Sequence, residues 1–267
     1  MDLELTGKRA VVTGGGSGIG KATATLLAGE GAEVVIASRS ADRLRQAASD
    51  IGAATGRRVH TAMVDTSDEA SVQAMAAEAA SLLRGPVEIL VNCAAIPAGQ
   101  RPAGGFETVT GEAFWADVNV KVLGYLRCAQ AVAPGMIGAG WGRIINVSGL
   151  AARSTGSVVG SIRNVSVAAM TKNLADELGR HGINVTVVHP GLTRTEATAG
   201  VVAATASREG IEPEAVERRL AAGNAIGRMI TAGEVAAVIT FLASPRSVAI
   251  NGDSVACGGG TPRVIHY

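Results

Sequence analysis

The sequence predicts a doubly wound α/β fold, in which a parallel sheet of about seven strands lies between two layers of helices. Two observations support this prediction. Short apolar runs rich in valine and isoleucine alternate with longer helical segments along the chain, which is the pattern of a parallel sheet buried on both faces. The first run also passes directly into a glycine-rich turn and then into a helical segment.

Each strand is expected where a compact β-branched run is bounded by glycine, serine or charged residues. In order, the expected strands are residues 9–14, 33–38, 58–64, 88–92, 143–148, 184–189 and 253–257. Parallel strands need crossover connections, and the helices that make them are expected at residues 18–30, 41–54, 68–83, 112–138, 158–180 and 233–243. The ligand crevice of such a fold lies at the carboxyl ends of the strands.

The length of 267 residues suits one domain spanning residues 1–267. Residues 193–222 have weak periodicity and interrupt the regular alternation just after a strand. Insertions at such a place often cover a substrate, so we expect a lid here.

Composition excludes several classes of partner. Lysine and arginine number 24 against 23 acidic residues, without runs of one sign, so no surface is predicted for nucleic acid. No apolar run reaches the roughly 18 residues of a membrane span, and the N-terminus has no signal-peptide layout, so a cytoplasmic protein is expected. Cys93, Cys128 and Cys257 are odd in number and lack metal-ligand spacing, which favours free thiols and no metal site.

The glycine-rich turn, TGGGSGIG at residues 13–20, connects the first strand to the first helix. Glycines allow the backbone to turn tightly and to approach an anion closely, and a helix N-terminus offers free N–H groups. We therefore expect a pyrophosphate site made of Gly14, Ser17, Gly18, Ile19 and Gly20.

Three further motifs accompany the turn: Asp65 after the third strand, NCAA at residues 92–95, and PGLTRT at residues 190–195. With the glycine turn, they resemble the short-chain dehydrogenase/reductase (SDR) family from about residue 3 to residue 260. The resemblance implies an oxidoreductase that binds NAD or NADP and a small-molecule substrate. It also implies that Asp65 holds the adenine, that Asn92 and Ala94 border the ribose, and that the nicotinamide end is contacted by the segment containing Pro190, Gly191, Leu192, Thr193 and Thr195.

The end of the second strand indicates which cofactor is bound. An acidic residue there pairs with the ribose 2′-hydroxyl of NAD, whereas a basic residue accommodates the 2′-phosphate of NADP. This chain has Ser38 and Arg39 there and no acid. A guanidinium binds phosphate in a bidentate manner, so NADP is favoured over NAD.

The chemical end departs from the family that the chain resembles. Its members typically use a tyrosine as proton donor and a lysine one helical turn later, together with a serine and an asparagine. An ungapped alignment on LADEL (174–178) places the tyrosine at Gly160 and the lysine at Asn164. A register shifted by two residues gives Ile162 and Ser166 instead. In both registers the tyrosine is missing, which makes this chain a divergent member.

The family's serine falls on Gly149, with Ser148 adjacent to it. For the family's asparagine, Asn119 is one candidate, but the Asn-x-x-Gly spacing fits Lys121 and Gly124 better. Lysine then stands at the asparagine position, and asparagine at the lysine position.

Such an exchange keeps one ammonium and one amide in the pocket, which indicates retained chemistry. We take Lys121, Ser148 and Asn164 as the catalytic candidates, although Lys121 on a helix face could also simply reach solvent. Arg163 and Arg194 are either anchors for an anionic substrate or surface arginines.

Three functions follow from these residues. The first is hydride transfer to or from an unidentified carbonyl or alcohol with an unusual proton donor, namely Lys121, a water or Tyr267 of a neighbouring subunit. The second is a cofactor-binding pseudoenzyme that regulates or assembles with an active relative. A non-redox elimination is the third, which the glycine turn disfavours. The resemblance further implies a homo-oligomer, most simply a tetramer, formed through the helices at 112–138 and 158–180.

Overall fold

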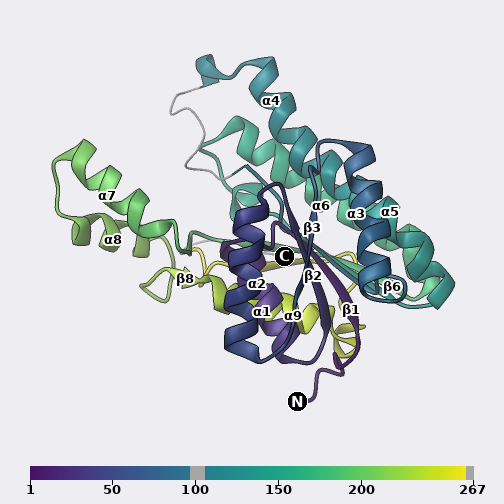
Figure 1. The fold of residues 1–267 in the computed structure, drawn as a ribbon. Helices are drawn as coiled ribbons and strands as arrows, with labels where there is room; N and C mark the ends of the chain where they lie inside the picture. The colour runs from purple at the N-terminus through teal and green to yellow at the C-terminus, as the bar shows by residue number, and fades with distance from the viewer. Residues whose placement is uncertain (97–105, 263–267) are drawn as a thin grey trace.

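A seven-stranded sheet with helices on both faces forms the body of the protein (Figure 1). The computed structural model describes residues 1–96 and 106–262. All neighbouring strands of the sheet are parallel, in the order β3-β2-β1-β4-β5-β6-β9, which confirms the predicted doubly wound fold. The strands are β1 (Arg9–Thr13), β2 (Glu33–Ser38), β3 (His60–Met63), β4 (Ile89–Asn92), β5 (Gly142–Val147), β6 (Ile183–Pro190) and β9 (Ser254–Cys257).

The helices divide between the two faces because successive strand side chains point to opposite sides. Val12 of β1 packs into one core, whereas Val11 packs into the other, and both are fully buried. The first core is covered by α1 (Gly18–Gly29), α2 (Ala41–Thr55) and α9 (Ala232–Ala243). The second is covered by α3 (Glu69–Leu82), α5 (Gly124–Ala139) and α6 (Val158–Leu178).

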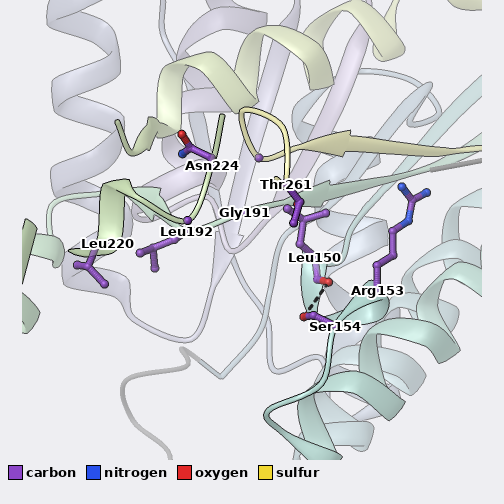
Figure 2. A pocket seen from close by; sticks show the side chains of 10 residues that line it. Leu150, Arg153, Ser154, Gly191, Leu192, Leu220, Asn224 and Thr261 are labelled. Atoms are coloured by element: carbon purple, nitrogen blue, oxygen red, sulfur yellow. Dashed lines mark hydrogen bonds between the residues drawn. The ribbon is translucent and has the colours of Figure 1, made fainter. Parts of the chain in front are cut away.

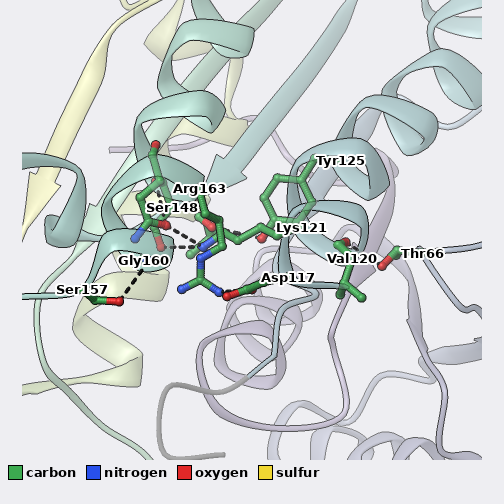
Figure 3. Close-up of polar contacts among 11 residues, drawn as sticks. Thr66, Asp117, Val120, Lys121, Tyr125, Ser148, Ser157, Gly160 and Arg163 are labelled. Atoms are coloured by element: carbon green, nitrogen blue, oxygen red, sulfur yellow. Dashed lines mark hydrogen bonds and ion pairs between the residues drawn. The ribbon is translucent and has the colours of Figure 1, made fainter. Parts of the chain in front are cut away.

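The prediction of one continuous helix at residues 112–138 is wrong. The structure divides it into α4 (Gly111–Val118), a π-helical turn η3 (Asn119–Leu123) and α5. The Thr66 hydroxyl donates a hydrogen bond of 2.9 Å to the carbonyl of Val120 inside this turn (Figure 3). A side chain that takes a carbonyl of the helical ladder widens the helix locally. Apolar spacing carries no mark of such a turn.

Residues 193–222 contain structure that the weak periodicity did not predict. They form β7 (Thr193–Arg194), α7 (Thr198–Glu209) and α8 (Pro213–Ala221), and α7 and α8 extend away from the body in green in Figure 1. β7 pairs with β8 (Ile230–Thr231) in a separate two-stranded sheet. The two helices share a small core of Val202, Ala206 and Val216, too short an apolar stripe to be evident from the sequence.

The strand order reverses between β1 and β4, which pair side by side with Thr13 opposite Asn92. In an open α/β sheet this reversal leaves a crevice at the carboxyl ends of the strands. The ends of β5 and β6 lie at the same edge, since they run parallel to β4. Within the described ranges, no helix combines the length and apolar character that a membrane crossing requires.

Candidate active site

Backbone packs directly against backbone in the turn between β1 and α1. Gly14 has a φ of +69°, and a Cβ there would lie 2.8 Å from the carbonyl carbon of Cys93. A Cβ on Gly20 would lie 2.4 Å from the carbonyl oxygen of Gly14. Real Cβ atoms do not approach other atoms so closely, so only glycine fits at these two positions.

The N-terminus of α1 has no capping group of its own. Ser17 occupies the N-cap position without a side-chain hydrogen bond, and the first turn contains no acidic residue. The Gly18 amide instead donates a hydrogen bond of 3.0 Å to Glu196 Oε2, from just before α7. Ile19 follows in the same turn. The sequence did not predict a role for Glu196, because no local pattern connects positions that lie so far apart in the chain.

Ser38, Arg39 and Asp65 lie at the ends of β2 and β3, which are neighbouring strands. Asp65 Oδ1 accepts hydrogen bonds from the Ser67 hydroxyl at 2.7 Å and the Ser67 amide at 2.9 Å. These bonds hold the pKa of Asp65 below its usual value, with a smaller contribution from the charge of Arg39. Arg39 is exposed. An anion placed here would therefore meet one cation and one carboxylate.

Asn92 ends β4 and is fully buried. Its amide donates to Asn146 Oδ1 at 3.0 Å, and Asn146 in turn donates to Thr171 Oγ1 at 3.0 Å. The chain of bonds connects β4, β5 and α6. Ala94 donates its backbone N–H to the Thr13 hydroxyl at 3.4 Å. Asn146 and Thr171 were missed by the sequence-based reasoning, because their partners are distant in the chain.

The segment after β6 follows Pro190 and borders the glycine turn. The hydroxyl of Thr193 donates to the Gly191 carbonyl at 2.9 Å. The Thr195 methyl group lies 3.4 Å from the position that a Cβ on Gly18 would occupy. Leu192 is 55 % exposed and lines a cavity. The turn and this segment are therefore neighbours.

Lys121, Ser148 and Asn164 form a buried polar cluster between η3, β5 and α6. Figure 3 labels Lys121 and Ser148 of this cluster. Lys121 Nζ donates to the Ser148 carbonyl at 3.0 Å and to Asn164 Oδ1 at 3.1 Å. The Ser148 hydroxyl donates to the Asn164 carbonyl at 3.0 Å. Lys121 is only 3 % exposed, so it does not reach solvent.

The alternative residues for the asparagine, tyrosine and lysine positions have different contacts. Asn119 hydrogen-bonds to the Ser67 carbonyl and to Arg127 on the outer side of η3. The Ser166 hydroxyl donates to the carbonyl of Ile162 within α6, and Ile162 is exposed.

Gly149 separates this cluster from a short 3-10 turn, η4 (Leu150–Arg153). A Cβ on Gly149 would lie 3.2 Å from Asn164 Nδ2. A serine at this position would therefore require the Asn164 amide to shift by a few tenths of an ångström.

Charge from Lys121 extends to the end of β4. Burial raises the pKa of the Cys93 thiol to about 12, although the Lys121 ammonium opposes the shift. The ammonium also lies 6.0 Å from the centre of the Tyr125 ring. A buried cation therefore lies near the carboxyl ends of β4 and β5.

The phenol of Tyr125 has a structural role. Tyr125 is fully buried, and its hydroxyl donates to the Val147 carbonyl at 3.0 Å. Burial raises its pKa well above the usual value. Tyr267, the other tyrosine of the chain, lies outside the described residues. Gly160 sits in the first turn of α6, where its amide donates to the Ser157 hydroxyl.

The two candidate arginines have different surroundings. Arg163 is buried and forms an ion pair of 2.7 Å with Asp117 of α4 (Figure 3). Arg194 is half exposed and binds Glu217 of α8 through both of its terminal nitrogens. Each guanidinium therefore already has a carboxylate partner.

A cavity of about 230 Å³ opens between the ends of β5 and β6 and the end of α8 (Figure 2). Leu192 and Leu220 contribute apolar surface, whereas Ser154 and Asn224 contribute polar groups. The Ser154 hydroxyl donates to the Leu150 carbonyl at 3.3 Å. The remaining lining residues are Arg153, Gly191, Gly223, Gly258 and Thr261. Such a mixed lining suits a small polar organic molecule.

The sequence matches the family described as short chain dehydrogenase over residues 8–206. It is 36 % identical to the short-chain reductase protein NovJ of Streptomyces niveus over 257 residues, which cover 95 % of this chain and 93 % of NovJ. It is 34 % identical to the dehydrogenase subunit BbsD of Thauera aromatica over 260 residues, with 96 % and 98 % of the two chains covered.

A solved structure shows the same architecture. L-sorbose reductase from Gluconobacter frateurii, complexed with NADPH and L-sorbose, superposes with a TM-score of 0.91 at 28 % identity. The superposition covers 99 % of this chain and 100 % of the reductase. Together with the parallel sheet and the glycine turn, these matches show that the chain belongs to the short-chain dehydrogenase family.

Proposed function

We propose that the protein is an NADP-dependent oxidoreductase that interconverts a carbonyl and an alcohol, with Lys121 in place of the usual tyrosine as proton donor. The observation that carries this proposal is the contact of Lys121 Nζ with Asn164 Oδ1 at 3.1 Å. It joins the two positions at which lysine and asparagine are exchanged relative to the family. Gly160, at the position of the tyrosine, has no side chain that could donate a proton.

The chain's residues fit a dinucleotide at the crevice. The close approaches at Gly14 and Gly20 build a tight turn, and the N-terminal amides of α1 suit a pyrophosphate. When bound, a nicotinamide cofactor supplies or accepts the hydride. The role of the protein's own residues is to orient the two reactants and to donate or accept the proton.

Lys121 is suited to that part in the direction of reduction. An ammonium within reach of the carbonyl oxygen stabilises the developing alkoxide and then transfers a proton to it, becoming a neutral amine. The Asn164 side chain and the Ser148 carbonyl orient the ammonium through their hydrogen bonds. In the direction of oxidation the neutral amine takes the proton of the alcohol.

Arg39 supports NADP as the preferred cofactor. It is an exposed cation at the end of β2, and no acidic residue stands at that strand end. The L-sorbose reductase that superposes on the chain was solved with NADPH. We assign the 2′-phosphate to Arg39 and the adenine to Asp65.

The cavity of Figure 2 and the α7–α8 segment support a substrate site under a lid. Leu220 and Asn224 bring the end of α8 to one side of the cavity, and Leu192 comes from the segment after β6. We propose one domain, with residues 193–222 as its lid. L-sorbose, the polyhydroxy ketone bound in the reductase structure, serves as a guide only to the size and polarity of the substrate.

Exposed apolar side chains on α4, η3 and α6 support a homotetramer. Trp115, Leu123, Ile162 and Val165 are between 39 % and 64 % exposed, which is unusual for large apolar groups that face water. Light scattering at micromolar concentration is expected to give the mass of four chains, and a monomer would exclude this arrangement. A cytoplasmic location remains a prediction.

A fluorescence titration with NADPH and NADH, followed by a turnover screen with ketoses and simple ketones, tests the proposal. We expect NADPH to bind more tightly than NADH, and at least one ketone to be reduced. Absence of binding to either cofactor would refute the proposal. Binding without turnover would favour the second candidate.

That second candidate is a cofactor-binding subunit without turnover. Two observations favour it: the Lys121 ammonium already has two hydrogen-bond acceptors, and the relative BbsD is named as a subunit of a dehydrogenase. A subunit of this kind would leave the chemistry to an active relative.

A further inference from the structure

We propose that Glu196 is an internal competitor for the anion site of the glycine turn, and that it sets the affinity of the protein for its cofactor. This inference rests on the proposed dinucleotide site. Glu196 Oε2 accepts a hydrogen bond of 3.0 Å from the amide of Gly18. Gly18 is the first residue of α1. A carboxylate at this position has the charge and the acceptor oxygens of a phosphate.

The N-terminus of α1 favours an anion at the position of the Glu196 carboxylate. The first turn of α1 contains no acidic side chain, and Ser17 makes no capping bond. The positive end of the helix dipole therefore attracts an anion from elsewhere. Glu196 supplies that anion from a position 178 residues further along the chain.

Its own segment holds Glu196 in place. On one side, Arg194 binds Glu217 of α8 through two hydrogen bonds. On the other, the Thr195 amide donates to the Thr198 hydroxyl at 2.8 Å, where α7 begins. Because both flanks are anchored, the carboxylate is presented to Gly18 at little entropic cost.

Competition follows from the single N–H of Gly18. That group cannot donate fully to a carboxylate and to a pyrophosphate oxygen at once, and two anions near one helix end repel each other. Binding of a pyrophosphate must therefore displace Glu196, and the displacement weakens the apparent affinity.

The test compares wild type with Glu196→Gln, which keeps the shape and removes the charge. Glu212→Gln is the matched control, because Glu212 is an exposed acid between α7 and α8 at a position without a side-chain cap. Affinities for inorganic pyrophosphate and for NADPH are measured by calorimetry. We expect Glu196→Gln to bind both probes about threefold to tenfold more tightly, the size of a charge effect at a helix end, and Glu212→Gln to behave as wild type.

Equal pyrophosphate affinity in wild type and Glu196→Gln would overturn the inference. An equal gain in Glu212→Gln would overturn it as well, since the effect would then be one of net charge. Absence of binding of either probe to all three proteins would also overturn it. If Glu196→Gln gains affinity for pyrophosphate while no protein binds NADPH, the inference stands and the proposed function fails.

Discussion

The glycine turn and the Lys121 cluster lie at the same edge of the sheet but are built from different material. The turn consists of backbone, with a Cβ on Gly20 excluded by a distance of 2.4 Å to Gly14. The cluster consists of side chains from η3 and α6, together with the backbone and hydroxyl of Ser148. The glycine turn therefore depends on glycine at fixed positions in the sequence. The Lys121 cluster depends instead on contacts between side chains from different elements.

Under the proposed exchange of Lys121 and Asn164, this difference accounts for the unequal divergence of the two regions. A backbone site tolerates no exchange of its glycines, because each close approach would be lost. A side-chain site keeps its groups when two positions exchange them, provided that the atoms still meet. Lys121 and Asn164 do meet, although they come from different elements.

The largest effect is expected on the side-chain region. Lys121→Met should lower turnover by about 10²- to 10⁴-fold, the usual contribution of a general acid. NADPH affinity should stay close to that of wild type, since the glycine turn is unchanged. Initial rates with the best substrate of the screen and a cofactor titration measure both quantities.

Lys172→Met is the matched control for this change, because Lys172 is 60 % exposed on α6 and pairs with Asp176. It should be as active as wild type. A Lys121→Met protein with full activity would show that the lysine has no part in proton transfer.

The next largest effect is expected on the free energy of unfolding, from the buried ion pair of Arg163 and Asp117. Arg163→Met leaves the Asp117 carboxylate buried without its cation, which typically costs about 3–5 kcal/mol. Arg194→Met breaks an exposed pair with Glu217 and should cost at most about 1 kcal/mol. Urea unfolding of the two variants measures the contrast.

Replacing both members, as in Asp117→Leu with Arg163→Met, should recover much of the lost free energy of unfolding, because neither charge of this pair is then left buried without its partner. Equal stability of Arg163→Met and Arg194→Met would mean that the buried pair is no more important than a surface contact.

The backbone region is tested by two alanines in one helix. Gly20→Ala should destabilise the protein by about 1–3 kcal/mol through overpacking and should abolish NADPH binding. Gly29→Ala, at the other end of α1 with no atom within 4 Å of its Cβ, should be neutral or stabilise by up to about 1 kcal/mol. Thermal unfolding and cofactor titration decide; normal NADPH binding by Gly20→Ala would contradict a backbone site.

The smallest effect is expected at Arg39, the side chain assigned to the 2′-phosphate of the cofactor. Arg39→Ala should weaken NADPH binding about tenfold, the low end for a charge-assisted hydrogen bond, and leave NADH unchanged. Arg57→Ala, which removes an exposed arginine at the far end of α2, serves as the control. The assignment fails if both cofactors lose affinity equally.

Sequence and structure agree best where a signal is local. The run at 33–38 is β2 residue for residue, since β-branched residues that are buried on both faces are distinctive. The π-helical turn was missed because its cause is Thr66, on another element. Asp117 and Glu196 were missed for the same reason: each makes its contact with a residue far away in the chain.

The π-helical turn η3 also bears on how this chain can change in length. Asp117 is bonded to Arg163 just before the turn, and Tyr125 is bonded to Val147 just after it. Both ends of the turn are thus fixed to the sheet and to α6, and the wider winding accommodates an extra residue between them. An insertion or deletion at η3 would be absorbed locally, and it would change which side chain stands where Lys121 now stands. A change in chain length at this turn therefore changes which side chain contacts Ser148 and Asn164, without refolding the elements around it.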